Sequence, residues 1–341
     1  MHDQHWASLK AAIAGQSQVP LPVGFIIDCP WLPNWYGVSL LDYFQSDEVW
    51  FEANKKAIET FPEVMFLPGF WSEFGMCTEP SAFGVKCQFP EDEFPFAQKC
   101  IVDADAVDDL EVPNVETDGL LPFMLKRLTA NRSRIEKMGH RIRFSISRGP
   151  LNIASFLMGT TEFLMMLGTD PERTHRLLQT INEFLIAWHL RQREAIDSID
   201  GMLVLDDIVG FISEADYLEF AHPYLKQLFD QPVSVKLFHN DADFRQSVKH
   251  YPDLGVNLYN PGIHMTMAEI HQATDNRMTI LGNIPPRDVL AAGTPDEVSA
   301  AVKNMLAEAK NHRRILASCG GGMPPGVSTE NIRAFVEAVR G

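Results

Sequence analysis

The sequence is poor in cysteine and has no long apolar run, and both absences restrict its class. Its 341 residues include five cysteines, Cys29, Cys77, Cys87, Cys100 and Cys319. An odd and sparse set in a long chain differs from a disulfide framework and favours a reducing compartment. The first residues contain no apolar segment of the signal-peptide type, and no run approaches the ~20 residues that span a bilayer. We therefore expect a cytoplasmic protein with no membrane partner.

An excess of positive charge is also missing. The chain has 29 Lys and Arg against 45 Asp and Glu, which gives a formal net charge of -16. Sequence-independent binding to DNA or RNA needs a basic surface, so nucleic acid is excluded as an expected partner. A GxGxxG segment is absent too, which removes the main signature of a dinucleotide-binding sheet. The remaining composition, 45% hydrophobic and 22% charged, is ordinary for a soluble enzyme.

Short apolar segments recur along the chain at the spacing of a strand–helix repeat. Eight are predicted to be strands: residues 23–27, 63–67, 141–147, 201–205, 233–238, 255–259, 278–282 and 314–318. Predicted helices separate most of them, so the strands should be parallel. Eight such units imply an α/β fold of the (β/α)8 TIM barrel type, with one domain over residues 1–341 and an N-terminal excursion of helices and loops. A doubly wound open sheet is the alternative.

Capping residues predict where several helices begin. Ser46 precedes two acidic residues and is expected to cap a helix that runs to about residue 60. Thr169 and Glu172 have capping-box spacing ahead of a helix to about residue 198. Thr294 and Glu297 have the same spacing, with proline at the first helical position between them.

Two of the predicted strands end at residues that commonly bind metals. Residues 233–238 run into His239 and Asp241, and residues 314–318 run into Cys319 and three glycines. If both are parallel barrel strands, all three side chains emerge at the same rim. Three donors and one open position are typical of a catalytic zinc site, so we predict these three as zinc ligands. The alternatives are a hydrogen-bonded histidine, a substrate-binding carboxylate and an inert buried cysteine.

Other polar residues should reach the same rim, among them Asp28, Arg148 and Asn283. Asp206 and Asp207 both follow the strand 201–205, and one of them should face the rim because successive strand residues alternate. We predict this pair to be catalytic, as a base or as a hydrogen-bond partner of the zinc-binding histidine. Asn260 is predicted to contact substrate, although shaping the loop is the simpler role for it.

Aromatic residues gather after the first two predicted strands. Trp31, Trp35 and Tyr36 follow the first strand, and Trp71 follows the second. We predict that they form an apolar lid over the barrel mouth and contact an aromatic substrate. The alternative is that they pack the core of an N-terminal cap.

Two longer segments resemble a known family. Residues 282–290 read Gly-Asn-Ile-Pro-Pro-Arg-Asp-Val-Leu, and residues 319–333 read Cys-Gly-Gly-Gly-Met-Pro-Pro-Gly-Val-Ser-Thr-Glu-Asn-Ile-Arg. Both closely resemble the uroporphyrinogen decarboxylase superfamily. The resemblance covers residues 120–341 well and the N-terminal third loosely, and it implies a (β/α)8 barrel.

The resemblance points to one of the two branches of this superfamily. True decarboxylases carry an arginine-rich N-terminal motif that binds substrate carboxylates, whereas residues 25–36 here contain no arginine. The other branch, the corrinoid-dependent methyltransferases, binds zinc through a His-x-Cys motif and a distant cysteine before a glycine-rich turn. His239 and Cys319 match that pattern, and Asp241 stands in place of the first cysteine. A carboxylate can still bind zinc and makes the metal a harder Lewis acid.

The resemblance therefore implies a zinc-dependent, demethylase-type methyltransferase. Zinc would polarise a methoxy oxygen or a related heteroatom, while a corrinoid (cobalamin) carried by a partner protein takes the methyl group. The implied partners are a small methylated substrate, in the first place an O-methyl compound, and the corrinoid protein. The resemblance also implies a homodimer, which members of the superfamily commonly form. Two alternatives stay open. A lyase acting on a porphyrin-type acid needs arginines in the cleft and no metal, and a non-catalytic binding barrel needs no metal.

Overall fold

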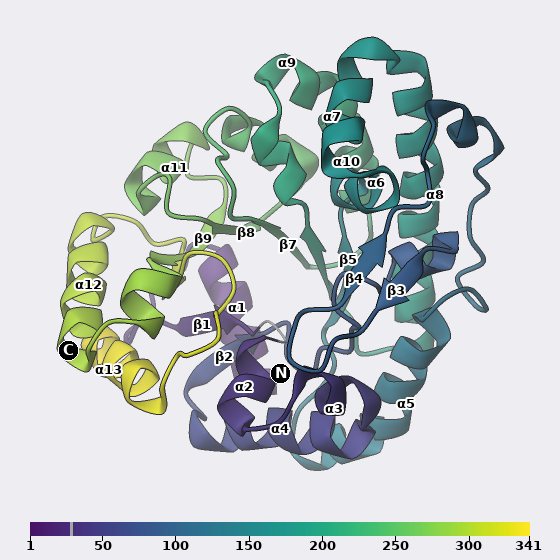
Figure 1. Cartoon of the computed structure of the whole chain (residues 1–341). Coiled ribbons are helices and arrows are strands. Elements are labelled where there is room, and N and C mark those ends of the chain that lie inside the picture. The colour runs from purple at the N-terminus through teal and green to yellow at the C-terminus, as the bar shows by residue number, and fades with distance from the viewer. Residues whose placement is uncertain (28–29) are drawn as a thin grey trace.

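A computed structural model describes residues 1–27 and 30–341 of the chain, so the predicted rim residue Asp28 lies outside the described residues. Eight parallel strands form one sheet that curls into a barrel, in the order β2-β1-β10-β9-β8-β7-β6-β5 (Figure 1). They are β1 (Val23–Ile26), β2 (Val64–Leu67), β5 (Phe144–Arg148), β6 (Gly201–Leu205), β7 (Val235–Asn240), β8 (Leu258–Pro261), β9 (Thr279–Ile284) and β10 (Ile315–Cys319). All eight predicted strands and the (β/α)8 barrel are confirmed.

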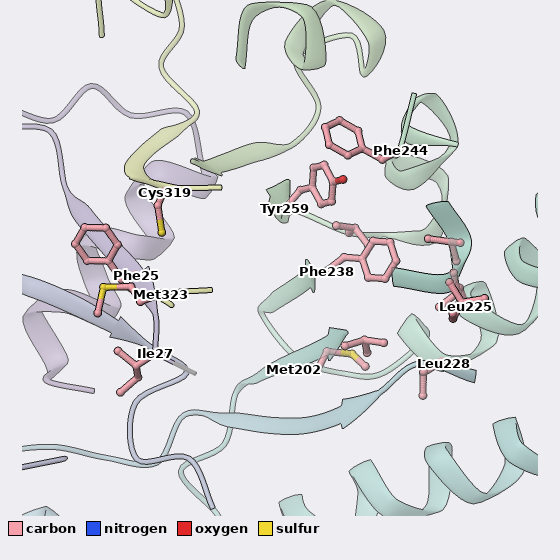
Figure 2. Packing of buried hydrophobic residues seen from close by; sticks show 14 of the residues in the cluster. Phe25, Ile27, Met202, Leu225, Leu228, Phe238, Phe244, Tyr259, Cys319 and Met323 are labelled. Atoms are coloured by element: carbon pink, nitrogen blue, oxygen red, sulfur yellow. The ribbon is translucent and has the colours of Figure 1, made fainter. Parts of the chain in front are cut away.

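The strands are buried on both faces, as expected for parallel strands covered by helices. Alternate residues point into the barrel, where the leucines Leu203, Leu237 and Leu258 from three adjacent strands belong to one inner cluster. The intervening residues, such as Met202 and Phe238, point outward and pack against the helices in a second and larger cluster (Figure 2). The face on which a residue lies therefore decides whether it can reach the barrel mouth.

Helices surround the barrel (Figure 1). The longest are α4 (Asp47–Thr60), α5 (Leu121–Lys137), α8 (Pro171–Ala195), α12 (Pro295–Glu308) and α13 (Thr329–Arg340). The shorter ones are α2 (Trp31–Tyr36), α3 (Leu40–Gln45), α6 (Pro150–Met158), α7 (Thr160–Thr169), α9 (Glu214–Asp216), α10 (His222–Phe229) and α11 (Met267–Ala273). Within the described residues, no single helix combines the length and the hydropathy needed to cross a bilayer; only the sharply bent pair α6 and α7 does so when taken together.

Two of the three predicted helix starts are confirmed. The Ser46 side chain accepts a hydrogen bond from the Val49 amide at the start of α4, and Thr294 and Glu297 form a reciprocal capping box on α12. The predicted capping box at Thr169 is wrong. Thr169 is the last residue of α7, where its hydroxyl bonds the Met165 carbonyl, and Asp170 caps α8 instead.

The N-terminal end of the barrel is closed by helix α1 (Asp3–Ile13). Trp6, Leu9 and Ala12 join the inner cluster, and the Trp6 ring packs edge-on against Phe144 with a centroid distance of 5.5 Å. The Thr279 hydroxyl at the start of β9 donates to the Ala12 carbonyl at 3.3 Å. A ligand can therefore approach the barrel interior from its C-terminal rim.

A seam runs between β2 and β5, because within the described residues no ladder of hydrogen bonds joins them. The chain between these strands makes the predicted excursion, which contains an antiparallel hairpin of β3 (Lys86–Gln88) and β4 (Phe96–Gln98). Side chains cross the seam near the rim. The Arg148 guanidinium at the end of β5 pairs with Glu73 at 3.0 Å, and the Arg148 amide donates to the Glu79 carboxylate at 3.3 Å.

Candidate metal and substrate site

Three side chains converge at the C-terminal rim, on the ends of the neighbouring strands β6 and β7. His239 Nε2 lies 3.7 Å from Asp207 Oδ1 and 4.0 Å from Asp241 Oδ2. One ligand atom from each residue lies within 4.8 Å of the others. His239 is on β7 and Asp241 directly follows this strand, so the two are two positions apart and continue the inward row of Val235 and Leu237.

His239 is held in one orientation by Asn260 on the adjacent strand, where the two residues are in register. The Asn260 amide nitrogen donates to the Leu281 carbonyl at 2.8 Å, so its oxygen is the atom 2.7 Å from His239 Nδ1. Nδ1 must then carry the proton, which leaves the Nε2 lone pair directed at the two aspartates. Asn260 is fully buried and orients the His239 ring, so its side chain is not placed to make the predicted substrate contact.

Asp241 is fixed by close approach of two glycine-containing loops. A Cβ atom on Gly262 would collide with the Asp241 carbonyl, and one on Gly321 would collide with the Asp241 carboxylate. Gly321 also has a φ of +74°, a conformation that other residues rarely adopt. Part of the glycine run after β10 thus has a definite role, which is to make room for this carboxylate.

Asp207 also faces the rim, and its Oδ1 accepts a hydrogen bond from the Asp241 amide at 3.1 Å. Burial raises the pKa of the Asp207 carboxyl, while the neighbouring His239 lowers it and the Asp241 charge raises it further. The side chain is 35% exposed, so solvent reaches it. Two carboxylates this close to each other favour a bound cation between them.

Asp206 points the opposite way and stabilises the wall. Its carboxylate accepts hydrogen bonds from the amides of Leu151 at 2.9 Å and Asn152 at 3.1 Å, in the first turn of α6. The side chain is fully buried, and burial raises its pKa well above the ordinary range, opposed by these amides. The catalytic role predicted for Asp206 is therefore replaced by the capping of α6, and Asp207 is the member of the pair that reaches the rim.

The structure does not bring Cys319 into the group formed by Asp207, His239 and Asp241. On β10 its neighbour Leu316 points into the barrel, whereas Ile315, Ala317 and Cys319 belong to the outer cluster. The thiol is fully buried beside Phe25 and Met323 (Figure 2). Burial raises its pKa to about 12, with a smaller contribution from the Asp241 charge, so Cys319 lies near the group without facing it.

The four aromatic residues predicted as a lid are packing residues. Trp31 is fully buried, donates to the Val327 carbonyl at 3.1 Å and stacks on Trp35 at 5.4 Å. Trp35 donates to Thr329 at 3.0 Å, and the rings of Trp35 and Tyr36 both contact the Lys56 ammonium.

Trp71 is 6% exposed and belongs to the inner cluster. The hydrogen bonds of Trp31 and Trp35 anchor α2 to the start of α13, and none of the four residues lines the cavity at the rim. The structure therefore supports packing, the alternative that the sequence left open, with Trp31, Trp35 and Tyr36 at the outer cluster and Trp71 in the inner one.

A cavity of ≈ 290 Å³ lies over the acidic group. Its lining includes Met76, Arg148, Asn152, Asp207, His239, Asp241, Arg287 and Met323. A smaller cavity of ≈ 170 Å³ lies on the other side of Asp241 and shares Arg287 with the first. A third, of ≈ 240 Å³, is at the closed end of the barrel beside His2, His5 and His140. Its lining contains no carboxylate, so the rim is the better candidate for chemistry.

The donors at the rim fit a zinc ion. Zinc bonds to histidine nitrogen and carboxylate oxygen are about 2.0–2.2 Å long, so tetrahedral donors lie about 3.4 Å apart. The separations from His239 Nε2, 3.7 and 4.0 Å, need a contraction of only a few tenths of an ångström. The histidine already has the required tautomer, and the cavity leaves an open side for a fourth ligand. These are the properties of a catalytic rather than a structural metal site.

Sequence reasoning did not identify Asp207 as a metal-type ligand or Arg287 as a cavity residue. The inward row of Leu203 and Leu205 leads to Asp207, but only the structure shows that these two leucines point inward. Arg287 directly follows the two prolines at 285 and 286 that come after β9, and no spacing rule predicts the direction of its side chain.

Comparison with known proteins identifies the family of the chain. The family model described as uroporphyrinogen decarboxylase (URO-D) matches residues 28–341. Uroporphyrinogen decarboxylase of Vesicomyosocius okutanii is 24% identical over 273 residues, covering 77% of this chain and 76% of that protein. The enzyme of Xanthomonas axonopodis pv. citri is 27% identical over 285 residues, covering 77% of both chains.

Among solved structures, a methyltransferase from Methanosarcina mazei superimposes with a TM-score of 0.81 at 18% identity, covering 97% of both chains. A B12-independent methionine synthase from Shewanella sp. W3-18-1 superimposes with a TM-score of 0.57 at 11% identity, covering 94% of this chain and 98% of that one. At these identities the two structures establish the shared barrel fold.

Proposed function

The chain belongs to the uroporphyrinogen decarboxylase family, and we propose that it is a zinc-dependent methyltransferase of this family. It would transfer a methyl group between a small methylated substrate, in the first place an O-methyl compound, and a corrinoid carried by a partner protein. The barrel similarity to a methyltransferase supports the branch. A cytoplasmic location and a homodimer are parts of the same proposal.

The observation that carries the proposal is the convergence of one histidine lone pair and two carboxylates under an open cavity. One ligand atom from each of His239, Asp207 and Asp241 lies within 4.8 Å of the other two. Of the two arginines that line the cavity, Arg148 pairs with Glu73 at 3.0 Å, which leaves the single charge of Arg287 against the two carboxylates of Asp207 and Asp241. A divalent cation would therefore satisfy charges that the chain itself leaves uncompensated.

Each residue has a defined task in this mechanism. His239 would hold the metal through Nε2, with Asn260 fixing its ring, and Asp241 and Asp207 would supply two oxygens. Bound zinc would act as a Lewis acid toward the heteroatom from which the methyl group departs. The volume of ≈ 290 Å³ admits a small substrate whose methylated end is kept at the open rim, where a partner protein can reach it.

A second candidate, a decarboxylating lyase, is favoured by the names of the curated relatives and by two arginines in the cavity. Arg148 and Arg287 both line it, as a carboxylate-rich substrate would require. Against this reading, Arg148 is paired with Glu73, and the segment after β1 contributes no arginine. A tetrapyrrole with many carboxylates would thus meet two aspartates and, besides the paired Arg148, one arginine, Arg287.

Metal content of purified protein tests the proposal most directly. We expect about one zinc per chain in the wild type, and loss of zinc in His239→Ala, Asp241→Ala and Asp207→Ala. His264→Ala is the matched control, because His264 is an exposed rim histidine outside the group. Cys319→Ala separates the two ligand sets. Zinc retained in Cys319→Ala supports Asp207 as the third donor. Zinc lost in Cys319→Ala but retained in Asp207→Ala would identify Cys319 as the third donor instead.

Activity then separates a methyltransferase from a binding barrel. The zinc-loaded protein is incubated with a panel of methoxylated compounds and a Co(I) corrinoid protein, and methyl-Co(III) formation is followed by absorbance. Formation that depends on zinc and on His239 supports the proposal. Absence of zinc even after reconstitution overturns it, and decarboxylation of a porphyrin-type acid by the metal-free protein would establish the lyase.

A further inference from the structure

Arg287 is a cation at the site that the protein itself does not use. It lies in the turn after β9 and lines both rim cavities, next to Asp241 in each. Across residues 1–27 and 30–341, no hydrogen bond or ion pair involves its guanidinium, and this includes the adjacent Asp288. Arg148, in the larger cavity, is 4% exposed and bonded to Glu73. The two arginines therefore differ in that only Arg287 has its charge available to a ligand.

The backbone that carries Arg287 is firmly anchored. Before it, the Asn283 amide nitrogen donates to the carbonyls of Gly262 at 3.1 Å and Met265 at 2.8 Å, which ties the end of β9 to the loop after β8. After it, the Asn331 amide nitrogen donates to the carbonyls of Leu290 and Gly293, which ties the same turn to α13. Arg287 is thus presented to the cavities from a braced turn rather than from a loose loop.

The charges at the rim indicate what Arg287 could bind. Asp207 and Asp241 repel an anionic ligand, and so does the chain as a whole with a net charge of -16. A substrate without charge would need no cation here. A guanidinium presents a rigid fork of donors that matches a carboxylate in two-point geometry. The cavity that it shares with the acidic group has room for one small molecule that spans both.

We propose that the substrate is a small methylated acid whose carboxylate binds to Arg287 while its methylated heteroatom lies at the group of His239, Asp207 and Asp241. The position of the methylated heteroatom rests on the proposed function. The position of the carboxylate on Arg287 does not depend on it. Arg287 is then a specificity-determining residue. It selects anionic over neutral methylated compounds and takes no part in the transfer itself.

Titration calorimetry with a matched pair of probes tests this assignment. The probes are 4-methoxybenzoate and the neutral 4-methoxybenzamide, which differ in charge and little in shape, followed by methoxyacetate and methoxyacetamide as a shorter pair. Each is titrated into wild type, Arg287→Gln and Arg287→Lys, with and without added zinc. We expect the acid to bind about 10- to 100-fold more tightly than its amide to wild type, the range of a charge-assisted hydrogen-bonded pair.

In Arg287→Gln the acid should fall to the affinity of the amide, while the amide changes less than about twofold and zinc content stays at the wild-type value. Arg287→Lys should be intermediate, since it keeps the charge and loses the fork. Equal binding of acid and amide to wild type, an unchanged acid affinity in Arg287→Gln, or binding of none of the four probes would overturn the proposal. Because the metal-free titrations report on Arg287 alone, failure of the zinc mechanism is seen separately.

Discussion

The two ends of the barrel are built from the same strands and serve opposite purposes. At the N-terminal end, α1 closes the barrel with Trp6, Leu9 and Ala12, all apolar and buried. At the C-terminal end, the same inward-facing positions become Asp207, His239 and Asp241, and a cavity remains open above them. Apolar packing at the closed end stabilises the fold. Because that packing does not involve the open end, the residues there can be charged and serve a ligand instead of the core.

Strand β7 shows the change from one purpose to the other within a few residues. Val235 and Leu237 are fully buried in the inner cluster, and His239 and Asp241 continue their row to the rim. A slip of one residue would put Phe238 and Asn240 in this row instead. The core therefore fixes the register of the site, and the following predictions separate the two ends by experiment.

The largest effect is expected at the closed end. Trp6→Ala removes a ring that is 5% exposed and packs on Phe144, so the free energy of unfolding should fall by about 3–5 kcal/mol. Urea denaturation measures this loss. Zinc binding by the folded fraction should stay at the wild-type value, and a variant that keeps its stability but loses zinc would contradict the division between the ends.

Asp206 and Asp207 are adjacent in sequence, and we expect their substitution to affect stability and zinc binding in opposite ways. Asp206→Ala leaves the amides of Leu151 and Asn152 without their acceptor, and should lower the free energy of unfolding by about 1–3 kcal/mol with little effect on zinc. Asp207→Ala should do the reverse, losing zinc while the metal-free protein unfolds at the same urea concentration. Equal behaviour of the two variants in both assays would refute the opposite orientations.

Asn260→Ala tests the support of the metal ligand. Without Asn260 the His239 ring can rotate and change tautomer, so zinc affinity should fall about 10- to 100-fold, or about 1.4–2.8 kcal/mol. Competition with a chromogenic chelator gives the dissociation constant. Asn257→Ala, at the opposite end of β8, is the matched control and should leave that constant unchanged; a direct substrate role for Asn260 would instead spare zinc affinity.

The last expected effect concerns acid stability and comes from a buried histidine behind the barrel wall. His189 is buried between the hydroxyls of Ser145 and Ser147, and burial lowers its pKa to about 3. The unfolded chain binds a proton there below about pH 6.5, so stability is complete above that pH and is lost as pH falls toward 3, at up to about 1.4 kcal/mol per pH unit. His189→Gln should flatten the plot of unfolding free energy against pH between 6 and 4.

His175→Gln, on the same helix α8 but 41% exposed, is the control for this slope. It should leave the pH dependence close to that of the wild type. If His189→Gln keeps the wild-type slope, the acid sensitivity originates elsewhere in the chain.

The sequence predicted the barrel well because each strand is a short apolar run with turn residues on both sides. It was less successful with Cys319, for a physical reason. Leu316 and Ala317 are both apolar, since strands of this barrel are buried on both faces, so their pattern does not tell which side chain points inward. Alternation likewise showed that one of Asp206 and Asp207 faces the rim, without telling which.

The sequence did not predict features that depend on contacts between distant segments. The contact of His239 with Asn260 follows from the register of β7 against β8, which no local pattern specifies. Trp31 packs against the nearby Trp35 and donates a hydrogen bond to the carbonyl of Val327, which is 296 residues away in the sequence. Residue types at strand ends thus predicted where polar side chains gather, and tertiary contacts decided which of them face one another.

The seam between β2 and β5 gives the barrel a place where it can change. Side chains such as Arg148 and Glu73 hold the two edges of the wall together, and in the part of the chain that the structure describes no ladder of hydrogen bonds joins these edges. Residues inserted into the excursion between these edges would lengthen the connection without interrupting any strand pairing. New segments can therefore be acquired at this edge of the mouth during evolution, while the row of residues that leads to His239 keeps its register.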